Sequence, residues 1–429
     1  MEDASEVKAS ANATEAYLLV IESHLATLTA PPSFTAHDIE KNLRAYARSA
    51  RLRMGSVQPP SFDGTRKVAI DSIYVSPLIV RQGRNTGTPT EIEDILAQRR
   101  AVILGDPGGG KTTLTMKGVH DALGSEQGRE RELSAPSPIP FVIVLREFGT
   151  AHRAQPRDVA EYISHSFLSS YQVDLSVDAI RWLLSVGRLQ IVFDGLDELL
   201  ESSFRRVVAD IIEAFSLAYP NVAILVTSRR VGYLDAPLST EEFSIFELSG
   251  FDGERVESYV NKWFSLDREI SELRRKELIS NFLREAQIVG DLCQNPLMLA
   301  LICNIYRTES YIPRNRPDVY QKCSTMLFDR WDRHRGLQEP FEFEAHIEPA
   351  IMHLAHLIYQ DEADALESGI TEHRLLDEAA NYLQRWQYES RAKAEHAAKE
   401  FIAFCRGRAW VFTDVGLTPS GESQTSGSG

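Results

Sequence analysis

Short apolar runs alternate with longer amphipathic segments over about residues 85–250 of the 429-residue chain. Continuous apolar runs separated by helical segments are typical of a parallel sheet that helices cover on both faces. The predicted strands are residues 101–104, 141–145, 189–193, 222–227 and 243–248, and the predicted helices lie near residues 111–123, 157–168, 177–186 and 202–218. This part of the chain is therefore predicted to be an α/β domain.

The N-terminal part of the chain is predicted to be α-helical. Apolar residues recur at helical spacing from about residue 14, Pro31 and Pro32 interrupt the pattern, and a second helix is predicted over residues 36–54. Residues 55–65 are rich in Pro, Gly and Ser, which indicates a linker. The β-branched and aromatic segment 70–80 is predicted to be extended.

The strand pattern fades after residue 251. Amphipathic stripes predict helices from there to residue 358, and a last helix is predicted near residues 392–405. Residues 408–418 have the pattern of a short β-hairpin. The Gly- and Ser-rich end, residues 423–429, is predicted to be a flexible tail or a cloning scar.

A glycine-rich loop joins the first predicted strand to the first predicted helix. Glycines let successive backbone N–H groups point at phosphate oxygens, and the N-terminus of the following helix adds partial positive charge. Lys111 is predicted to reach the β- and γ-phosphates, Thr112 to ligate Mg²⁺, and Thr113 to join the nucleotide-binding residues. The alternative is a chance glycine-rich turn. The loop matches G-x-x-x-x-G-K-[ST] in full and consists of Gly105, Asp106, Pro107, Gly108, Gly109, Gly110, Lys111 and Thr112.

The predicted strand at residues 189–193 is followed by acidic residues. Asp194 comes directly after it, and the C-terminal ends of parallel strands face the ligand crevice. Asp194 is therefore predicted to hold Mg²⁺ opposite Thr112, directly or through a water. Glu198 is predicted to orient or deprotonate the attacking water, with Asp197 supporting it. The alternative is a solvated acidic turn that caps the next helix.

Composition narrows the classes of function. The net charge of −15 argues against broad binding of nucleic-acid phosphates. The sequence begins with no signal-peptide pattern and contains no apolar run long enough to span a bilayer, so a cytoplasmic protein without membrane contact is expected. The cysteines form no C-x-x-C pair and are expected to be reduced, buried thiols; they are Cys293, Cys303, Cys323 and Cys405.

These motifs resemble those of the NACHT group of STAND NTPases, the nucleotide switches of NOD-like immune receptors and their bacterial relatives. That family has a small residue after the magnesium-binding aspartate and two acidic residues further on, as Gly195, Asp197 and Glu198 stand here. The resemblance continues in residues 225–230 (LVTSRR), where it implies that Arg229 senses the γ-phosphate. An arginine at a strand end beside the phosphate loop also has the chemistry to read triphosphate charge. The alternative is a surface arginine pair.

Two further segments extend the resemblance. Residues 295–299 (NPLML) look like the family's helical-domain motif, whose proline packs near the adenine, which implies a nucleotide contact for Pro296. The alternative is an ordinary proline at a helix start. Residues 73–78 look like the segment that leads into the family's nucleotide-binding domain.

The resemblance implies four regions before the tail. They are an α-helical N-terminal region and linker at 1–65, a P-loop NTPase domain at 66–250, a helical domain at 251–318, and a winged-helix-like domain at 319–422. The last region is expected to be incomplete, because the sequence ends before the family's Phe-x-His segment, whose histidine contacts the bound diphosphate.

The implied function is a signalling switch that binds ATP or ADP with Mg²⁺, hydrolyses ATP slowly and self-associates on activation by an unknown trigger, through an unknown effector. The short helical N-terminus and the lack of a sensor solenoid suggest a bacterial form, and hence innate immunity or anti-phage defence. Three alternatives stay open. A ring-forming motor ATPase or remodeller usually carries a second acid where Gly195 stands, a GTPase would need the Asp that residues 261–264 lack, and a scaffold without catalysis would not need Glu198.

Overall fold

The computed structural model divides by its contacts into two units, with the boundary after Gly336, and each unit is described by itself. The structure describes residues 35–59, 67–82, 90–96, 98–124, 138–199, 202–267, 270–335, 349–354, 356–357 and 372–406.

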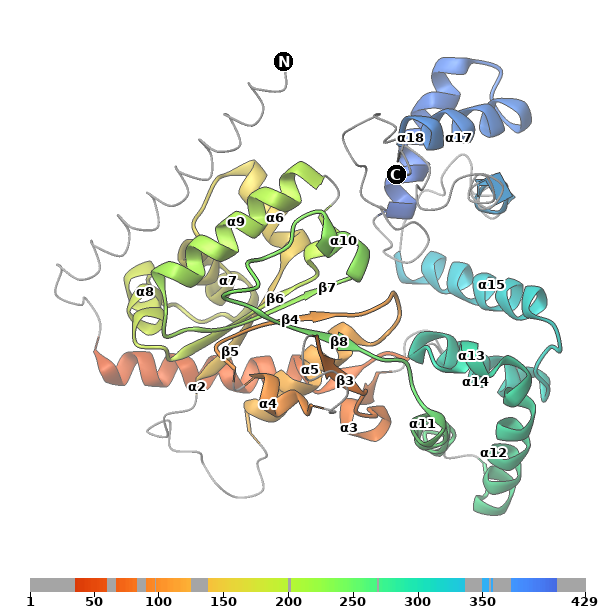
Figure 1. Cartoon of the computed structure of the whole chain (residues 1–429), viewed down its shortest axis with the longest axis horizontal. Coiled ribbons are helices and arrows are strands. Elements are labelled where there is room, and N and C mark those ends of the chain that lie inside the picture. Colours follow the sequence, from red (N-terminus) through yellow and green to blue (C-terminus); the bar gives the residue numbers. More distant parts are fainter. Residues whose placement is uncertain are drawn as a thin grey trace, which may run out of the picture. The chain divides into compact units, whose positions relative to one another are not determined.

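A six-stranded sheet forms the centre of the first unit (Figure 1). Its strands lie in the order β3-β8-β4-β7-β6-β5, and every neighbouring pair is parallel except β3 with β8. Because β4, β7 and β6 are adjacent and parallel, their carboxyl ends meet at one edge of the sheet. The α/β fold class and the five predicted strands are confirmed. The strands are β3 (Ile79–Arg81), β4 (Arg100–Leu104), β5 (Ile139–Val144), β6 (Leu189–Asp194), β7 (Ala223–Ser228) and β8 (Ser244–Leu248).

Both faces of the sheet are buried. Alternate residues of β4 enter different apolar cores, with Val102 and Leu104 in one and Ala101 and Ile103 in the other. Complete burial of one aliphatic side chain contributes roughly 1.5–3 kcal/mol to folding. Burial on both sides explains why the central strands contain runs of consecutive apolar residues instead of apolar residues at every second position.

Helices cover each face (Figure 1). The first core takes side chains from α2, α6, α7, α8 and α9, and the second takes side chains from α4 and α5. The four predicted helices correspond to α5, α7, α8 and α9 and are confirmed. The helices of this part are α2 (Ala36–Met54), α3 (Ile70–Ile73), α4 (Ile92–Leu96), α5 (Lys111–Ala122), α6 (Leu145–Ala154), α7 (Val159–Tyr171), α8 (Val177–Ser185), α9 (Ser202–Ala218) and α10 (Arg230–Leu234).

Helix α2 confirms the helix predicted over residues 36–54. Its N-cap is Thr35, whose side chain accepts a hydrogen bond from Asp38 N at 3.1 Å. Further along, the ring of Tyr46 lies 4.6 Å from the ring of Phe167 between centroids. The Tyr46 hydroxyl donates to Pro140 O at 2.8 Å, so α2 packs into the same core as the sheet.

The prediction that residues 70–80 are extended is wrong for the first half of that segment. Ile70–Ile73 form α3, and only Ile79–Arg81 form a strand. Tyr74 N donates to Ile70 O at 2.8 Å, which closes one helical turn. Ser72 Oγ donates to Ala69 O at 2.6 Å, so a local side-chain bond supports the turn against the β propensity of the isoleucines.

Two boundaries also differ from prediction. Leu145, predicted to end a strand, begins α6. The segment 55–65, predicted to be a linker, contains β1 (Ser56–Val57), which pairs with β2 (Val68–Ala69) in an antiparallel ladder. At Leu145 and at residues 56–57, the secondary structure depends on the strand or surface that the segment contacts. The local sequence does not reveal that contact.

Only helices follow β8 in the described part of the first unit, as predicted. Their core includes Phe264, Phe282 and Tyr306, with centroid separations of 5.9 Å and 5.3 Å along that series. Helix α15 passes through residue 319, so the boundary predicted there stays a prediction. The elements are α11 (Gly253–Ser265), α12 (Glu272–Ala286), η2 (Gln287–Val289), α13 (Gly290–Cys293), α14 (Pro296–Glu309) and α15 (Arg316–Arg335).

Three of the four cysteines lie in this helical core. Cys293, Cys303 and Cys323 are buried and unbridged. Burial raises the pKa of the Cys293 and Cys323 thiols to about 12. The expected buried thiols are confirmed at these three positions, and the side chain of Cys405 lies outside the described residues.

The second unit contains a pair of packed helices, α17 (Glu372–Trp386) and α18 (Arg391–Arg406). Helix α18 confirms the predicted last helix. The helix predicted from residue 14, the hairpin predicted at 408–418 and the tail at 423–429 lie outside the described residues. Among the helices that the structure describes, none has the length and apolar character needed to cross a bilayer.

Candidate nucleotide-binding site

The glycine-rich loop leaves β4 at the carboxyl edge of the sheet. Gly105 N donates to Ser228 O of β7 at 3.2 Å, which ties the start of the loop to the neighbouring strand. Gly108 and Gly110 have φ angles of 72° and 92°, in the left-handed region that glycine adopts most readily. The chain enters α5 at Lys111. The strand–loop–helix context predicted for a phosphate-binding loop is present.

Lys111 lies folded over this loop. Its Nζ donates to Gly105 O at 2.5 Å and to Asp106 O at 3.2 Å. Burial lowers the pKa of Lys111, while the charge of Asp197 opposes this and that of Arg229 adds to it. Within the described ranges no carboxylate lies at ion-pair distance from Nζ. A partly buried cation with only carbonyl partners fits a phosphate ligand.

Asp194 ends β6 directly beside the start of α5. Thr112 Oγ1 donates to Asp194 Oδ2 at 3.3 Å, and Thr227 Oγ1 donates to Asp194 Oδ1 at 2.6 Å. Burial raises the pKa of Asp194, and the two threonine hydrogen bonds oppose that shift. A hydroxyl and a carboxylate at this separation are the hard oxygen donors that Mg²⁺ prefers, so these residues fit the predicted ion.

Glu198 lies in η1 (Leu196–Glu198), the single turn after β6. Gly195 precedes it with a φ of 84°, and a Cβ built on Gly195 would lie 3.1 Å from the Glu198 side chain. The glutamate therefore folds back toward the strand end. Burial raises the pKa of Glu198, and the positive charge of Arg146 opposes the shift. A partly buried carboxyl group with a raised pKa suits a proton acceptor.

Asp197 contacts Arg229, the residue that follows β7. Asp197 Oδ1 accepts a hydrogen bond from Arg229 N at 2.8 Å, and Oδ2 lies 2.9 Å from Arg229 Nε. The side chains of Asp197 and Arg229 are only 9% and 10% exposed, which distinguishes this pair from a surface ion pair. The predicted support of Glu198 by Asp197 stays a prediction, and the contact observed for Asp197 is with the arginine.

The first turn of α14 touches the glycine-rich loop. Asn295 Nδ2 donates to Pro107 O at 2.8 Å, and Leu297 N donates to Gly108 O at 3.2 Å. Asn295 Oδ1 also caps the helix by accepting from Leu297 N at 3.0 Å. Pro296 lies between the two residues that bond the loop, and its predicted contact with adenine stays a prediction.

This contact leads to a prediction for Gly108→Ala. A Cβ at residue 108 would lie 2.8 Å from Leu297 Cβ and 2.9 Å from Asn295 Oδ1, at a φ of 72°. We expect the substitution to lower the free energy of unfolding by about 2–4 kcal/mol, from the left-handed backbone and the overlap together. Urea denaturation of the full chain measures this change.

Gly124→Ala is the matched control. Gly124 also has a positive φ, of 118°, but no described atom lies within 4 Å of its would-be Cβ. In the control, the free energy of unfolding should fall by only about 1–2 kcal/mol, the cost of the left-handed backbone alone. An equal decrease in the free energy of unfolding of the two variants would show that α14 does not pack against the loop at Gly108.

Two buried residues that support this edge were not predicted from the sequence. Thr227 Oγ1 accepts from Gly195 N at 2.9 Å while it donates to Asp194, so it fixes the end of β6. Arg205 of α9 is 1% exposed and donates to Leu199 O at 3.0 Å and to Asp235 Oδ2 at 2.6 Å. A threonine at the end of a strand belongs to no distinctive sequence pattern. Arg205 is followed by Arg206, and such a pair of arginines usually indicates a solvent-exposed helix face.

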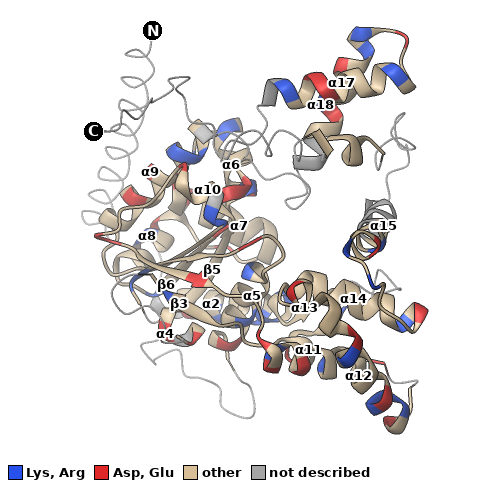
Figure 2. Ribbon diagram, turned by 45° about the vertical axis from the view of Figure 1, so that its right-hand side comes forward, with Lys and Arg blue, Asp and Glu red and all other residues tan. Residues whose placement is uncertain are grey.

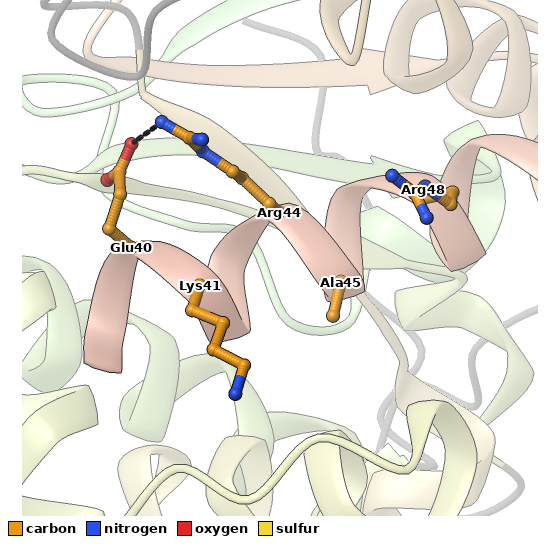
Figure 3. Close-up of a pocket in the computed structure, with 5 residues that line it drawn as sticks. All are labelled: Glu40, Lys41, Arg44, Ala45 and Arg48. Atoms are coloured by element: carbon orange, nitrogen blue, oxygen red, sulfur yellow. Dashed lines mark hydrogen bonds and ion pairs between the residues drawn. The ribbon is translucent and has the colours of Figure 1, made fainter. Parts of the chain in front are cut away.

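A separate cavity of about 410 Å³ lies along α2 (Figure 3). Arg44 pairs with Glu40 at 3.3 Å there. None of the predicted nucleotide-binding residues lines this cavity, so it is distinct from the candidate site. Its lining residues are Glu40, Lys41, Arg44, Ala45 and Arg48.

Charges of both signs are mixed on two helices that follow the sheet. Figure 2 shows acidic and basic residues intermixed along α11 and α12. The side chains of Asp71, His120 and Asp121 come within 4.8 Å of one another, but Lys117 pairs with both carboxylates. Lys117 therefore compensates part of the negative charge of that cluster.

Comparison with known proteins finds distant similarities. An uncharacterized WD repeat-containing protein of Nostoc sp. is 24% identical over 226 residues, which cover 48% of this chain and only 14% of the relative's length. Among solved structures, PCH-2 of C. elegans has 10% identity and a TM-score of 0.30, covering 56% of this chain and 63% of its own. Cdc6p of Pyrobaculum aerophilum has 13% identity and a TM-score of 0.29, covering 71% and 88%.

A family model adds the assignment. The model described as the NACHT domain matches residues 99–267, the span that carries the glycine-rich loop, Asp194 and Arg229. Residues 99–267 of this chain are therefore a NACHT domain, which is a nucleotide-binding P-loop NTPase module.

Proposed function

We propose that this chain is a signalling switch that binds ATP or ADP with Mg²⁺, hydrolyses ATP slowly and self-associates when ATP replaces ADP. The NACHT domain supports nucleotide binding and NTPase chemistry. The choice of adenine nucleotides is supported by the resemblance to NACHT switches, and the switching behaviour is supported by that resemblance and by the hydrogen bonds between α14 and the glycine-rich loop.

In this proposal Lys111 and the loop amides bind the phosphates at the positive end of α5. Thr112 and Asp194 hold Mg²⁺, which when bound neutralises charge on the transferred phosphate. Pro296 contacts the adenine. The proposed nucleotide-binding residues are Gly105, Asp106, Pro107, Gly108, Gly109, Gly110, Lys111, Thr112, Thr113 and Pro296.

Glu198 is proposed to take a proton from the attacking water. Burial raises the pKa of Glu198, which makes it a stronger base than an exposed glutamate. Arg229 is proposed to read the γ-phosphate, the one group that distinguishes ATP from ADP.

The observation that carries the switch is the bonding of α14 to the phosphate loop. Two loop carbonyls, of Pro107 and Gly108, accept hydrogen bonds from Asn295 and Leu297. A change in the loop on nucleotide exchange therefore alters bonds at the start of the helical region. A ligand shifts such an equilibrium only if it binds one arrangement better, and the γ-phosphate supplies that difference.

Innate immunity or anti-phage defence, in the cytoplasm, is the proposed setting, on the resemblance to NACHT switches. The competing proposal is a ring-forming motor ATPase. A motor turns over many ATP per second without a trigger, whereas the switch is expected to hydrolyse less than about one per second, at or below the low end of enzyme turnover.

Mass spectrometry of the nucleotide retained by the purified chain tests the switch, together with light scattering in ADP and in a non-hydrolysable ATP analogue. We expect retained ADP, a larger species with the analogue, and slow turnover. Retained guanine nucleotide, or fast turnover with one association state in both nucleotides, would contradict the proposal.

Asn295→Asp provides a sharper prediction. Aspartate keeps the oxygens that cap α14 but loses the Nδ2 donor to Pro107 O, and its charge repels that carbonyl. We expect nucleotide still to bind, while the difference in association state between ADP and the ATP analogue shrinks. Asn315→Asp, which changes a comparable N-terminal cap away from the loop, is the matched control and should behave as the parent.

A further inference from the structure

The two acidic residues of η1 face different neighbours. Glu198 folds back over Gly195, whereas Asp197 turns toward the end of β7. β6 and β7 are parallel neighbours, so the residues just beyond their ends come together. Asp197 is three residues past the end of β6, and Arg229 directly follows β7.

We propose that Asp197 is a positioning residue for Arg229, and so determines how well the site discriminates ATP from ADP. The carboxylate holds the arginine at two points, because Oδ1 accepts from the backbone N at 2.8 Å and Oδ2 lies 2.9 Å from Nε. Neither Nη nitrogen of Arg229 donates a hydrogen bond to any described residue. The clamp at Nε thus fixes the guanidinium plane and leaves its outer donors for a phosphate oxygen.

Packing immobilises Asp197 in turn. A Cβ built on Gly232 of α10 would lie 2.5 Å from Asp197 Cβ, so only glycine at 232 lets α10 approach this closely. Beneath this contact, Arg205 donates to Leu199 O at 3.0 Å and to Gly232 O at 3.4 Å. One buried guanidinium therefore joins the segment after η1 to the helix that packs on Asp197.

The contact between Asp197 and Arg229 is expected to affect the affinity for ATP but not the affinity for ADP. A preorganised guanidinium loses less entropy on binding a γ-phosphate than a free one, so the clamp raises ATP affinity and leaves ADP affinity unchanged. This role rests on the proposed function, in which Arg229 reads the γ-phosphate. It is also distinct from the predicted support of Glu198, which would affect turnover and not affinity.

The experiment is a double-mutant cycle on equilibrium binding of ADP and of a non-hydrolysable ATP analogue to the full chain. Asp197→Ala should lower the preference for the ATP analogue by about tenfold, or 1.4 kcal/mol, with ADP affinity within about twofold. Arg229→Ala should lose the preference to a similar extent. Adding Asp197→Ala to Arg229→Ala should cost nothing more, since Asp197 acts through the arginine.

Gly232→Ala offers an independent route to the same contact. Its Cβ would displace Asp197 without changing any charge, so the ATP preference should again fall while ADP binding persists. Persistent ADP binding also shows that each variant is folded. Additive losses in the cycle, or an unchanged ratio in Asp197→Ala, would overturn the role of Asp197. Failure of the parent chain to bind either nucleotide would instead overturn the proposed function.

Discussion

Replacing Lys111 by alanine is expected to weaken binding of both ATP and ADP by at least about 100-fold. Among the described residues the Lys111 ammonium has only carbonyl partners, Gly105 O and Asp106 O, and it lies over the loop proposed to hold the phosphates. Hydrogen bonds to charged groups contribute about 1.5–3 kcal/mol each, and two lost bonds correspond to roughly two to four powers of ten in affinity. Isothermal titration of the full chain measures the change.

Lys117→Ala is the matched control for this variant. Lys117 lies in the same helix, but it pairs with Asp71 and Asp121 away from the loop. Its removal should leave nucleotide affinity within about twofold, because ion pairs with exposed carboxylates contribute little. If Lys111→Ala bound nucleotide as tightly as Lys117→Ala, the loop would not be the phosphate site.

Replacing Glu198 by glutamine is expected to slow ATP hydrolysis by about 100-fold or more while leaving ATP affinity nearly unchanged. General-base catalysis contributes about 10²–10⁴ in rate, and the amide cannot accept the proton. Glutamine matches glutamate in shape, so the turn over Gly195 is retained. Single-turnover measurements of the bound nucleotide should therefore find ATP trapped.

Glu147→Gln, on the exposed side of α6, is the control and should hydrolyse ATP at the parental rate. A pH series adds a second check on the parent chain. Burial raises the pKa of Glu198, and a base works only when deprotonated, so turnover should be lost as pH falls through that raised value. Parental turnover in Glu198→Gln would assign the base to another residue.

The central strands were predictable because burial on both faces requires a run of consecutive apolar residues, which is easily recognised in a sequence. In β6, all six residues are buried, and the sequence is apolar up to Asp194 apart from Gln190. The edge strand β3 has no such run of apolar residues. It is three residues long and exists through antiparallel pairing with β8, a partner more than 160 residues away in the chain.

The phosphate loop was predictable for a different reason, since its function needs Gly, Gly, Lys and Ser or Thr at fixed places within eight consecutive residues. The other parts of the site depend on the register between strands. Arg229 meets Asp197 only because β6 and β7 are parallel neighbours, and Thr227 reaches Asp194 for the same reason. Local sequence indicates which side chains are chemically suitable, but not which of them face one another.

The capping contact of Asn295 has a consequence for the backbone of the loop. A peptide unit is rigid and planar, so fixing the carbonyl of Pro107 also fixes the N–H of Gly108 in the opposite direction. The direction of that dipole is thus set by a side chain 188 positions further along the chain. A substitution that reorients the Asn295 side chain would therefore turn the Gly108 N–H away from a bound anion. The loop would then bind anions less tightly, although none of its own residues had changed.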